Sequence, residues 1–309
     1  DALLSRGLGD VYKRQDITLG IIGGGQLGSM LAIAAKKLNI KTVIFCDDVD
    51  APAQNFCSKF IYGTYSDREK ILEFIQQVDI VTFEFENIPY ETLDEINKSK
   101  SVLPKPSVNR LIQHRLAEKD FVNNLNIRTT RYVSIEKKSD IESLEDFLPG
   151  ILKTMTLGYD GKGQHPIKSI EDLNLLNIDF SKGYILEKLV KLKKEISIII
   201  TRFKNQKYEI YEPIENTHQD QILKHSKIPA DIDNKIFDQS KDWAISIAEE
   251  LKYVGTLCVE FFIDKNDNLY VNEIAPRVHN SGHLTINAYN VSQSVSYTHL
   301  RAHETTRHL

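Results

Sequence analysis

The sequence has few cysteines, no long apolar run and no signal-peptide pattern of charged residues followed by apolar ones at its start. Its three cysteines, Cys46, Cys57 and Cys258, are too few and too scattered for a disulfide framework, and none belongs to a close pair of the zinc-binding kind. We expect reduced thiols buried as small hydrophobic side chains. Apolar stretches such as residues 196–200 are far shorter than the roughly 18 residues of a membrane span. These absences predict a cytoplasmic protein without a membrane partner.

An excess of positive charge is also missing. The 39 Lys and Arg residues against 43 Asp and Glu residues give a net charge of -4, without the basic surplus that binding to nucleic-acid phosphates requires. A length of 309 residues suggests two domains at about 150 residues each. The hydrophobic share of 41% and charged share of 27% are typical of a globular protein with a substantial core.

The two ends of the chain differ from the rest. Residues 1–15 and 294–309 show no sustained hydrophobic period and resemble translated sequencing adapters. Three histidines in the tail, His299, His303 and His308, lack the spacing of a metal site. We therefore expect the native protein to begin near Asp16 and to be cut short near Gln293. Both ends are set aside as non-native in the prediction of the fold.

Strand and helix patterns alternate in the first part of the chain. Apolar strands at 17–23, 41–46 and 79–83 are separated by helices at 26–38 and 67–76, which predicts a parallel, Rossmann-like α/β sheet over residues 16–105. After Pro104 and Pro106, one helix is expected at 108–125. Strands at 150–153, 184–187, 195–203 and 207–211, an amphipathic helix around 243–251 and a hairpin of 256–264 with 268–274 follow. This second part predicts an α+β domain.

A glycine-rich turn follows the first expected strand. Residues 23–28 read GGGQLG, which matches G-x-G-x-x-G, and Asp47 and Asp48 lie about 20 residues further on. Glycines permit a tight turn and a close ligand approach, and the following helix N-terminus favours an anion. Three interpretations stay open: NAD(P) binding, binding of another phosphate or ribose, and close packing alone.

A second glycine-rich loop follows Lys153, which ends an apolar strand. Residues 156–164 read TLGYDGKGQ, with three glycines within six positions and Lys162 among them, and this is not a Walker loop. Backbone amides and lysines of a mobile lid could close over a triphosphate. The alternative interpretation is a flexible hairpin tip between two strands.

Two glutamates occupy matching positions in the last expected hairpin. If its loop is symmetric about Asn266 and Asp267, Glu260 and Glu273 pair across the strands, with Cβ atoms about 5 Å apart. Two such carboxylates repel unless a cation lies between them, and Mg²⁺ is the natural occupant. A register slip of one residue would instead place Glu260, solvated, opposite Asn272.

A polar loop follows this hairpin directly. Residues 275–283 read APRVHNSGH, so Arg277, His279 and His283 concentrate anion-binding groups beside the expected metal. The alternative is a solvated loop without a ligand.

Together these motifs resemble the 5-(carboxyamino)imidazole ribonucleotide synthases of purine synthesis, a family of ATP-grasp ligases. The resemblance covers residues 17 to about 293. It depends on GGGQLG, EFEN at 84–87, GYDGKGQ after Lys153, EKLV at 187–190 with the following Glu195, HQD at 218–220 and NEIAPRVHNSGH at 272–283. In the wider superfamily an asparagine often replaces Ala275, and the alanine matches this family.

The resemblance implies a Rossmann-like domain followed by an ATP-grasp domain over 106–293, with a small subdomain at about 125–190 and a large one at about 191–293. It also implies roles for individual residues. Mg²⁺ would be held by Glu260 and Glu273, and catalytic roles would fall to Lys153, Arg277, Asn280 and Ser281. The amine substrate would contact Gly25, Gln26, Leu27, Glu84, Glu86, Tyr159, His279 and His283. ATP would contact Arg115, Lys153, Gly158, Tyr159, Asp160, Gly161, Lys162, Gly163, Gln164, Glu187, Lys188, Leu189, Val190, Glu195, His218, Asn272 and Glu273.

The implied reaction has two steps and three small-molecule substrates. Bicarbonate attacks the γ-phosphorus of ATP to give carboxyphosphate, and the exocyclic amine of aminoimidazole ribonucleotide is then carboxylated, leaving ADP and phosphate. Residues 294–309 would stand in place of the family's C-terminal domain, and the absence of that domain would weaken binding of the amine. A homodimer is a further expectation. The rivals are another ATP-grasp carboxylase or formate-using ligase, a NAD(P)-dependent oxidoreductase and a non-catalytic nucleotide-binding module.

Overall fold

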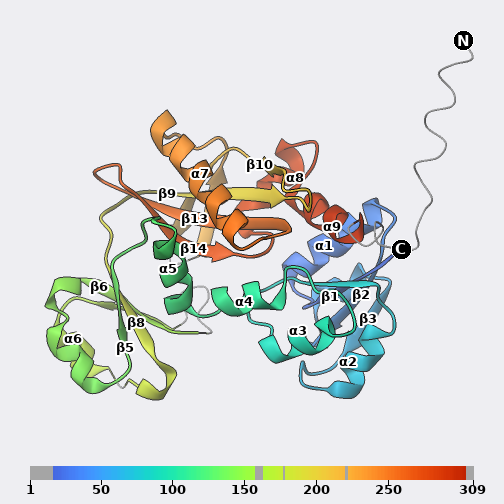
Figure 1. Cartoon of the computed structure of the whole chain (residues 1–309), viewed down its shortest axis with the longest axis horizontal. Coiled ribbons are helices and arrows are strands. Elements are labelled where there is room, and N and C mark those ends of the chain that lie inside the picture. Colours follow the sequence, from blue (N-terminus) through green and yellow to red (C-terminus); the bar gives the residue numbers. More distant parts are fainter. Residues whose placement is uncertain (1–16, 157–162, 177, 220–221, 304–309) are drawn as a thin grey trace, which may run out of the picture.

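The computed structural model describes residues 17–156, 163–176, 178–219 and 222–303 (Figure 1). The first part is a parallel sheet in the order β3-β2-β1-β4, as the alternating pattern predicts. Its strands are β1 (Thr18–Ile22), β2 (Lys41–Cys46), β3 (Lys59–Tyr62) and β4 (Ile80–Phe83), and its helices are α1 (Gln26–Lys37), α2 (Arg68–Ile75) and α3 (Tyr90–Asn97). The sequence did not predict β3, because this edge strand has only four residues and is half exposed.

The single helix expected at 108–125 is wrong. The structure has two helices, α4 (Pro106–Ile112) and α5 (Arg115–Asn124), with a break at Gln113 and His114. The imidazole Nδ1 of His114 accepts a hydrogen bond of 3.3 Å from the backbone N–H of Ala117 and so caps α5. The break lets α5 present Arg115 and Glu118 to a cavity described below.

The second part contains two antiparallel sheets. The small sheet has the order β5-β8-β6-β7, is flanked by helix α6 (Ile170–Leu175), and consists of β5 (Tyr132–Ile135), β6 (Gly150–Thr154), β7 (Gln164–Ile167) and β8 (Tyr184–Lys188). The large sheet has the order β12-β11-β9-β13-β14, with β10 (Tyr208–Ile210) paired to β9. Its other strands are β9 (Leu192–Arg202), β11 (Ile214–Gln219), β12 (Ile222–Lys227), β13 (Gly255–Asp264) and β14 (Leu269–Ala275). Strands β11 and β12 were not predicted, since their alternation is mostly polar.

The pleat of the large sheet separates a core face from a polar face. Helix α7 (Asn234–Glu250) packs Ala244 and Ile247 against Ile196 and Ile198 of β9, all fully or almost fully buried, which confirms the predicted amphipathic stripe. Because successive side chains of a strand point to opposite faces, Ser197 of β9 lies on the other face. Glu260 of β13 is its cross-strand partner, so the polar residues of the hairpin share that face.

The exclusion of the whole tail from the fold is wrong for residues 294–303. These residues belong to helix α9 (Gln293–His303), which lies beside α1 in Figure 1, after the short helix α8 (Thr285–Ala288). Tyr297 is fully buried in the cluster that contains Leu31 and Val278. The pattern escaped detection because Ser294 and Thr298, rather than apolar residues, occupy neighbouring buried positions of the helix. Residues 1–15 and 304–309 lie outside the described residues.

We expect Tyr297→Phe to lower the free energy of unfolding by about 1 to 2 kcal/mol, because a buried polar group loses its partner. The Tyr297 hydroxyl lies 2.7 Å from Thr82 Oγ1 and 3.2 Å from the carbonyl oxygen of Phe83. Chemical denaturation measures the difference. An unchanged midpoint and slope would show that α9 does not contribute to the core in solution.

No helix in the described part of the chain is long and apolar enough to cross a lipid bilayer.

Candidate active site

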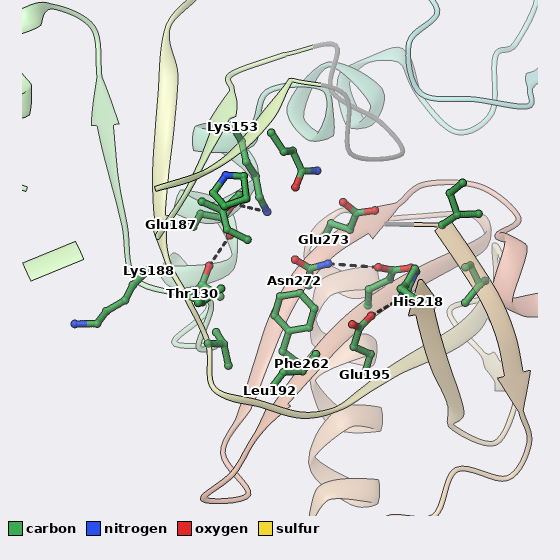
Figure 2. Close-up of a pocket in the computed structure, with 18 of the residues that line it drawn as sticks. Thr130, Lys153, Glu187, Lys188, Leu192, Glu195, His218, Phe262, Asn272 and Glu273 are labelled. Atoms are coloured by element: carbon green, nitrogen blue, oxygen red, sulfur yellow. Dashed lines mark hydrogen bonds and ion pairs between the residues drawn. The ribbon is translucent and has the colours of Figure 1, made fainter. Parts of the chain in front are cut away.

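A cavity of about 540 Å³ lies between the small sheet and the polar face of the large sheet (Figure 2). It brings together most of the side chains expected to bind ATP, from segments far apart in the sequence. Among its lining residues are Lys153, Gln164, Glu187, Lys188, Leu189, Val190, Glu195, His218, Glu260, Asn272, Glu273, His279 and Asn280. Sequence reasoning missed the apolar walls, Ile151, Pro166, Leu192, Ile222, Leu223 and Phe262, and it also missed Thr130. No motif marks these residues, because only the packing of the two sheets brings them together.

The predicted pairing of Glu260 with Glu273 is confirmed, but by an unexpected route. Beside the turn, Ile263 pairs with Leu269 and Phe261 with Val271, which is the register of the slipped alternative. A β-bulge between Glu260 and Phe261 then shifts the register by one residue, so that Glu260 pairs with Glu273. The bulge therefore sets the two carboxylates side by side on the polar face.

The two carboxylates have opposite pKa shifts. Burial and the charge of Glu260 raise the pKa of Glu273. Burial also acts to raise the pKa of Glu260, but the contact of His279 Nε2 with Glu260 Oε1 at 2.9 Å outweighs it and lowers that pKa. A third carboxyl, Glu118, accepts from the backbone N–H of Ile274 at 2.6 Å, and burial together with Glu273 raises its pKa to about 8. The site thus concentrates negative charge with little solvent, which a bound cation would relieve.

No group of three or more His, Cys, Asp or Glu side chains within the described ranges has the arrangement of a metal site. The two hairpin carboxylates are oxygen donors of the kind that Mg²⁺ accepts, and Mg²⁺ usually completes its coordination with water and substrate phosphates. This donor set fits a divalent cation that arrives together with a nucleotide.

A buried carboxylate between two lysines forms the opposite wall of the cavity. Glu187 Oε1 lies 3.0 Å from Lys153 Nζ, and Glu187 Oε2 lies 3.4 Å from Lys119 Nζ. Thr130 Oγ1 donates to Glu187 at 2.9 Å, and Lys119 donates to Thr129 and Thr130 at 3.0 Å each. Burial raises the pKa of Glu187, but the two lysine charges outweigh it and lower that pKa to about 2. The contact with Glu187 thereby fixes the place of Lys153 at the cavity wall. Lys119 was missed because it lies inside a helix without a motif.

Glu195 and His218 form a second charged pair at the cavity wall. His218 Nδ1 lies 2.5 Å from Glu195 Oε2, and this contact raises the pKa of His218 although burial opposes it (Figure 2). The two residues come from neighbouring strands of the polar face. A carboxylate and an imidazole in this position suit the hydroxyl groups of a ribose.

A second cavity of about 150 Å³ adjoins the first. Four residues line both cavities: Gln164, Glu273, His279 and Asn280. Arg115 lines only the second cavity. Arg277 lines it too and contacts Glu86 there, since Nε and Nη2 of Arg277 both lie 2.6 Å from Glu86 Oε2. The Arg277 charge lowers the pKa of Glu86 despite burial. Two ligands could therefore meet at Glu273, His279 and Asn280.

The backbone amides of the first glycine loop are already occupied by an acidic side chain of the same protein. The Glu84 carboxylate, from the end of β4, accepts hydrogen bonds from the backbone N–H groups of Gly25 and Gly28 at the start of α1. A Cβ atom on Gly23 would come within 2.6 Å of Glu84, and Gly23 has a φ of +95°. This arrangement gives a physical reason why the loop does not offer its amides to a dinucleotide pyrophosphate. Gly25, Gln26, Leu27 and Glu84 are not among the residues that line either cavity.

The remaining residues expected at the site do not line the two cavities or are not all described. Ser281 is fully buried behind His279, and neither Ser281 nor His283 lines either cavity. Gly158, Tyr159, Asp160, Gly161 and Lys162 of the expected lid lie outside the described residues. Gly163 is described, has a φ of +72°, and leaves only 2.8 Å between a Cβ atom and Thr154 Oγ1, so a glycine is required there.

Comparison with known proteins agrees with this geometry. Residues 120–294 match the ATP-grasp domain, and residues 17–113 match the ribonucleotide synthetase preATP-grasp domain. The N5-carboxyaminoimidazole ribonucleotide synthase of Staphylococcus aureus (strain COL) is 37% identical over 279 residues, which are 89% of this chain and 74% of that protein. The enzyme of the same name from Brucella melitensis is 37% identical over 290 residues, 92% of this chain and 80% of that protein.

Solved structures with similar folds carry the same name. The ADP complex of the Staphylococcus aureus synthetase has a TM-score of 0.88 and 35% identity, and covers 94% of this chain and 79% of its own. The Aspergillus clavatus synthase, solved with ADP and 5-aminoimidazole ribonucleotide, has a TM-score of 0.84 and 25% identity. The match covers 93% of this chain and 77% of that chain. The chain belongs to the N5-carboxyaminoimidazole ribonucleotide synthase family of ATP-grasp enzymes.

Proposed function

We propose that this chain carboxylates the exocyclic amine of 5-aminoimidazole ribonucleotide with ATP and bicarbonate, releasing ADP and phosphate. The observation that carries the proposal is the pair of adjoining cavities, which share Glu273, His279 and Asn280. A reaction that passes an activated carboxyl group from one bound substrate to another needs such a shared wall, because the reacting groups must come within van der Waals contact.

ATP would occupy the larger cavity. Its base would lie among the apolar walls near Leu189 and Phe262, and its ribose would lie by Glu195 and His218. Lys153 would then face the phosphates. These placements put the γ-phosphate at the polar wall that both cavities share, since the phosphates must extend away from the apolar pocket.

Mg²⁺ would be held by Glu260 and Glu273, and when bound it offsets the charge that develops during phosphoryl transfer. The amine substrate would occupy the smaller cavity. Its phosphate and ring would lie among Arg115, Arg277 and Asn280. The Glu86 carboxylate fixes the orientation of the Arg277 guanidinium there, and the residues of the second glycine loop would exclude water, since carboxyphosphate hydrolyses readily. We also propose that the chain forms a homodimer and acts in the cytoplasm.

The test is ADP release by the purified chain with Mg²⁺, in the presence and absence of bicarbonate and of 5-aminoimidazole ribonucleotide. We expect release to rise at least about tenfold only when both are present, because the activated carboxyl group needs the amine to complete the cycle. Stimulation by a different amine, or by formate in place of bicarbonate, would favour another ATP-grasp ligase. Enhanced nicotinamide fluorescence on adding NADH or NADPH would favour the oxidoreductase and contradict the role of Glu84 at the first glycine loop.

A further inference from the structure

The chain passes from one wall of the larger cavity to the other over residues 128–131. At one end of this crossing, Arg128 O accepts a hydrogen bond of 2.8 Å from the backbone N–H of Val271 on β14 of the large sheet. At the other end, Arg131 O accepts one of 2.8 Å from the backbone N–H of Lys188 on β8 of the small sheet. Residues 129 and 130 therefore join the two sheets, as does the short run 189–191 between β8 and β9.

One side chain of α5 contacts both residues of the crossing. Lys119 Nζ donates hydrogen bonds of 3.0 Å each to Thr129 Oγ1 and Thr130 Oγ1. Thr129 Oγ1 in turn donates to Val271 O at 2.8 Å, and Thr130 Oγ1 donates to Glu187 Oε2 at 2.9 Å. Each hydroxyl has one hydrogen and gives it to a carbonyl or carboxylate oxygen, so both threonine oxygens accept from the lysine. A branched bridge of four hydrogen bonds results.

The bridge is shielded from water. Lys119 and Thr130 are each 3% exposed, and Glu187 is 4% exposed. A buried group that loses its partner here has little water to replace it, so each bond restricts the side chains it joins. A lysine amine has at least two hydrogens to donate whether or not it is charged. The two bonds to the threonines therefore form in either state.

The bridge ends beside groups on opposite sides of the cavity. On the small sheet, Glu187 Oε1 lies 3.0 Å from Lys153 Nζ. On β14 of the large sheet, Val271 precedes Glu273 by two positions. Figure 2 shows Lys153 and Glu187 on one side of the cavity and Glu273 on the other. The bridge thus connects the wall that carries Lys153 with the wall that carries Glu273.

We propose that Lys119, Thr129 and Thr130 are positioning residues, which hold the two sheets at the separation that lets Lys153 and Glu273 engage the same nucleotide. Lys119 is not among the residues that line either cavity, so it acts through the threonines and not on the ligand. Without the bridge, the crossing keeps only the backbone hydrogen bonds at its two ends. The sheets can then turn about the residues between those ends, as domains do about a hinge.

The first test measures the placement of the two sheets without any ligand. Spin labels are attached through Lys168→Cys, at an exposed position after β7, and Glu249→Cys, at an exposed position of α7, in a Cys57→Ser background. Double electron–electron resonance then gives the distribution of distances between the labels. We expect a narrow distribution for the otherwise unchanged chain. Lys119→Met keeps the length of the side chain but removes both donors, and it should widen the distribution at least about twofold.

Thr130→Val removes one branch of the bridge with a side chain of the same shape, and it decides the question if Lys119→Met does not fold. Thr130→Ser keeps the hydroxyl and should keep the narrow distribution. Thr201→Val is the matched control, since it removes another buried threonine hydroxyl, 2.8 Å from Thr256 Oγ1 within the large sheet. An unwidened distribution in Lys119→Met or in Thr130→Val, in whichever variant folds, would overturn the proposal.

The second test concerns the ligands and rests on the function proposed above. By calorimetry, we expect Lys119→Met and Thr130→Val to raise the Kd for ADP with Mg²⁺ at least about tenfold, or about 1.4 kcal/mol. In kinetic assays, KM for the amine should stay within about twofold, because Arg115 and Arg277 of the smaller cavity do not belong to the small sheet.

Thr201→Val should leave both constants unchanged. A widened distance distribution with unchanged affinity for ADP would overturn the positioning role. If the amine does not stimulate ADP release by the wild-type chain, the proposed function fails, while the label distances and the affinity for ADP still decide the role of the bridge.

Discussion

Glu273→Gln is expected to lower amine-stimulated ADP release by about 10³-fold, which corresponds to about 4 kcal/mol of lost transition-state stabilisation. The amide keeps the shape of the side chain but removes a charged oxygen ligand from the pair with Glu260. The same change should raise the melting temperature of the metal-free chain, because it removes a buried carboxylate repelled by Glu260. Steady-state kinetics and thermal unfolding on one protein sample measure both effects.

The gain in stability has a definite pH dependence. The pKa of Glu273 is raised in the folded state, so this group favours folding below the pKa of the unfolded chain and loses that contribution as pH rises through the folded value. The wild-type chain and Glu273→Gln should therefore melt close together below the pKa of the unfolded carboxyl and diverge as pH rises above it, until the difference levels off above the folded pKa. Glu249→Gln, an exposed change on α7, is the control and should alter neither property. Turnover above about a tenth of wild type at saturating Mg²⁺ would contradict the metal assignment.

Arg277→Met is expected to lower the free energy of unfolding by about 3 kcal/mol, because it leaves the Glu86 carboxylate largely buried without its cation. Glu86→Gln should cost less, since the Arg277 side chain keeps its bond to Val278 O at 2.9 Å. The double variant should be more stable than the sum of the two single changes predicts. Chemical denaturation of the four proteins gives the coupling energy, and both single variants should lose stimulation by the amine.

The exposed pair of Glu95 on α3 and Lys98, the residue that follows this helix, provides the matched control. Its side chains approach to 2.7 Å, close to the distance at Arg277, but both are more than half exposed. Surface pairs contribute little, so Lys98→Met should change stability by less than about 1 kcal/mol. Strict additivity of the Arg277 and Glu86 changes would show that their contact has no energetic weight and that the smaller cavity has no fixed guanidinium.

The sequence alone determined the features that depend on local pattern. The alternation of apolar strands with helices predicted the parallel sheet, the apolar runs predicted the strands β9 and β13, and helical spacing predicted the buried stripe of α7, because burial imposes such patterns on the chain. The motif resemblance indicated the family, which the comparisons show. The pairing of Glu260 with Glu273 was predicted as well, although for a simpler hairpin than the bulged one that forms.

Only the tertiary structure decided which distant groups meet. No local pattern predicts that Glu84 accepts from the amides of the first glycine loop. None predicts that Lys119 and Lys153 both contact Glu187. The hydrogen bonds that connect Asn216 and Ser197 through Ser281 to His279 are equally absent from any local pattern. These contacts join residues that lie far apart in the chain, and they pair buried polar groups that would be costly to bury alone. The tail helix shows the same limit, since Tyr297 is buried by the neighbouring domain and not by a period of its own sequence.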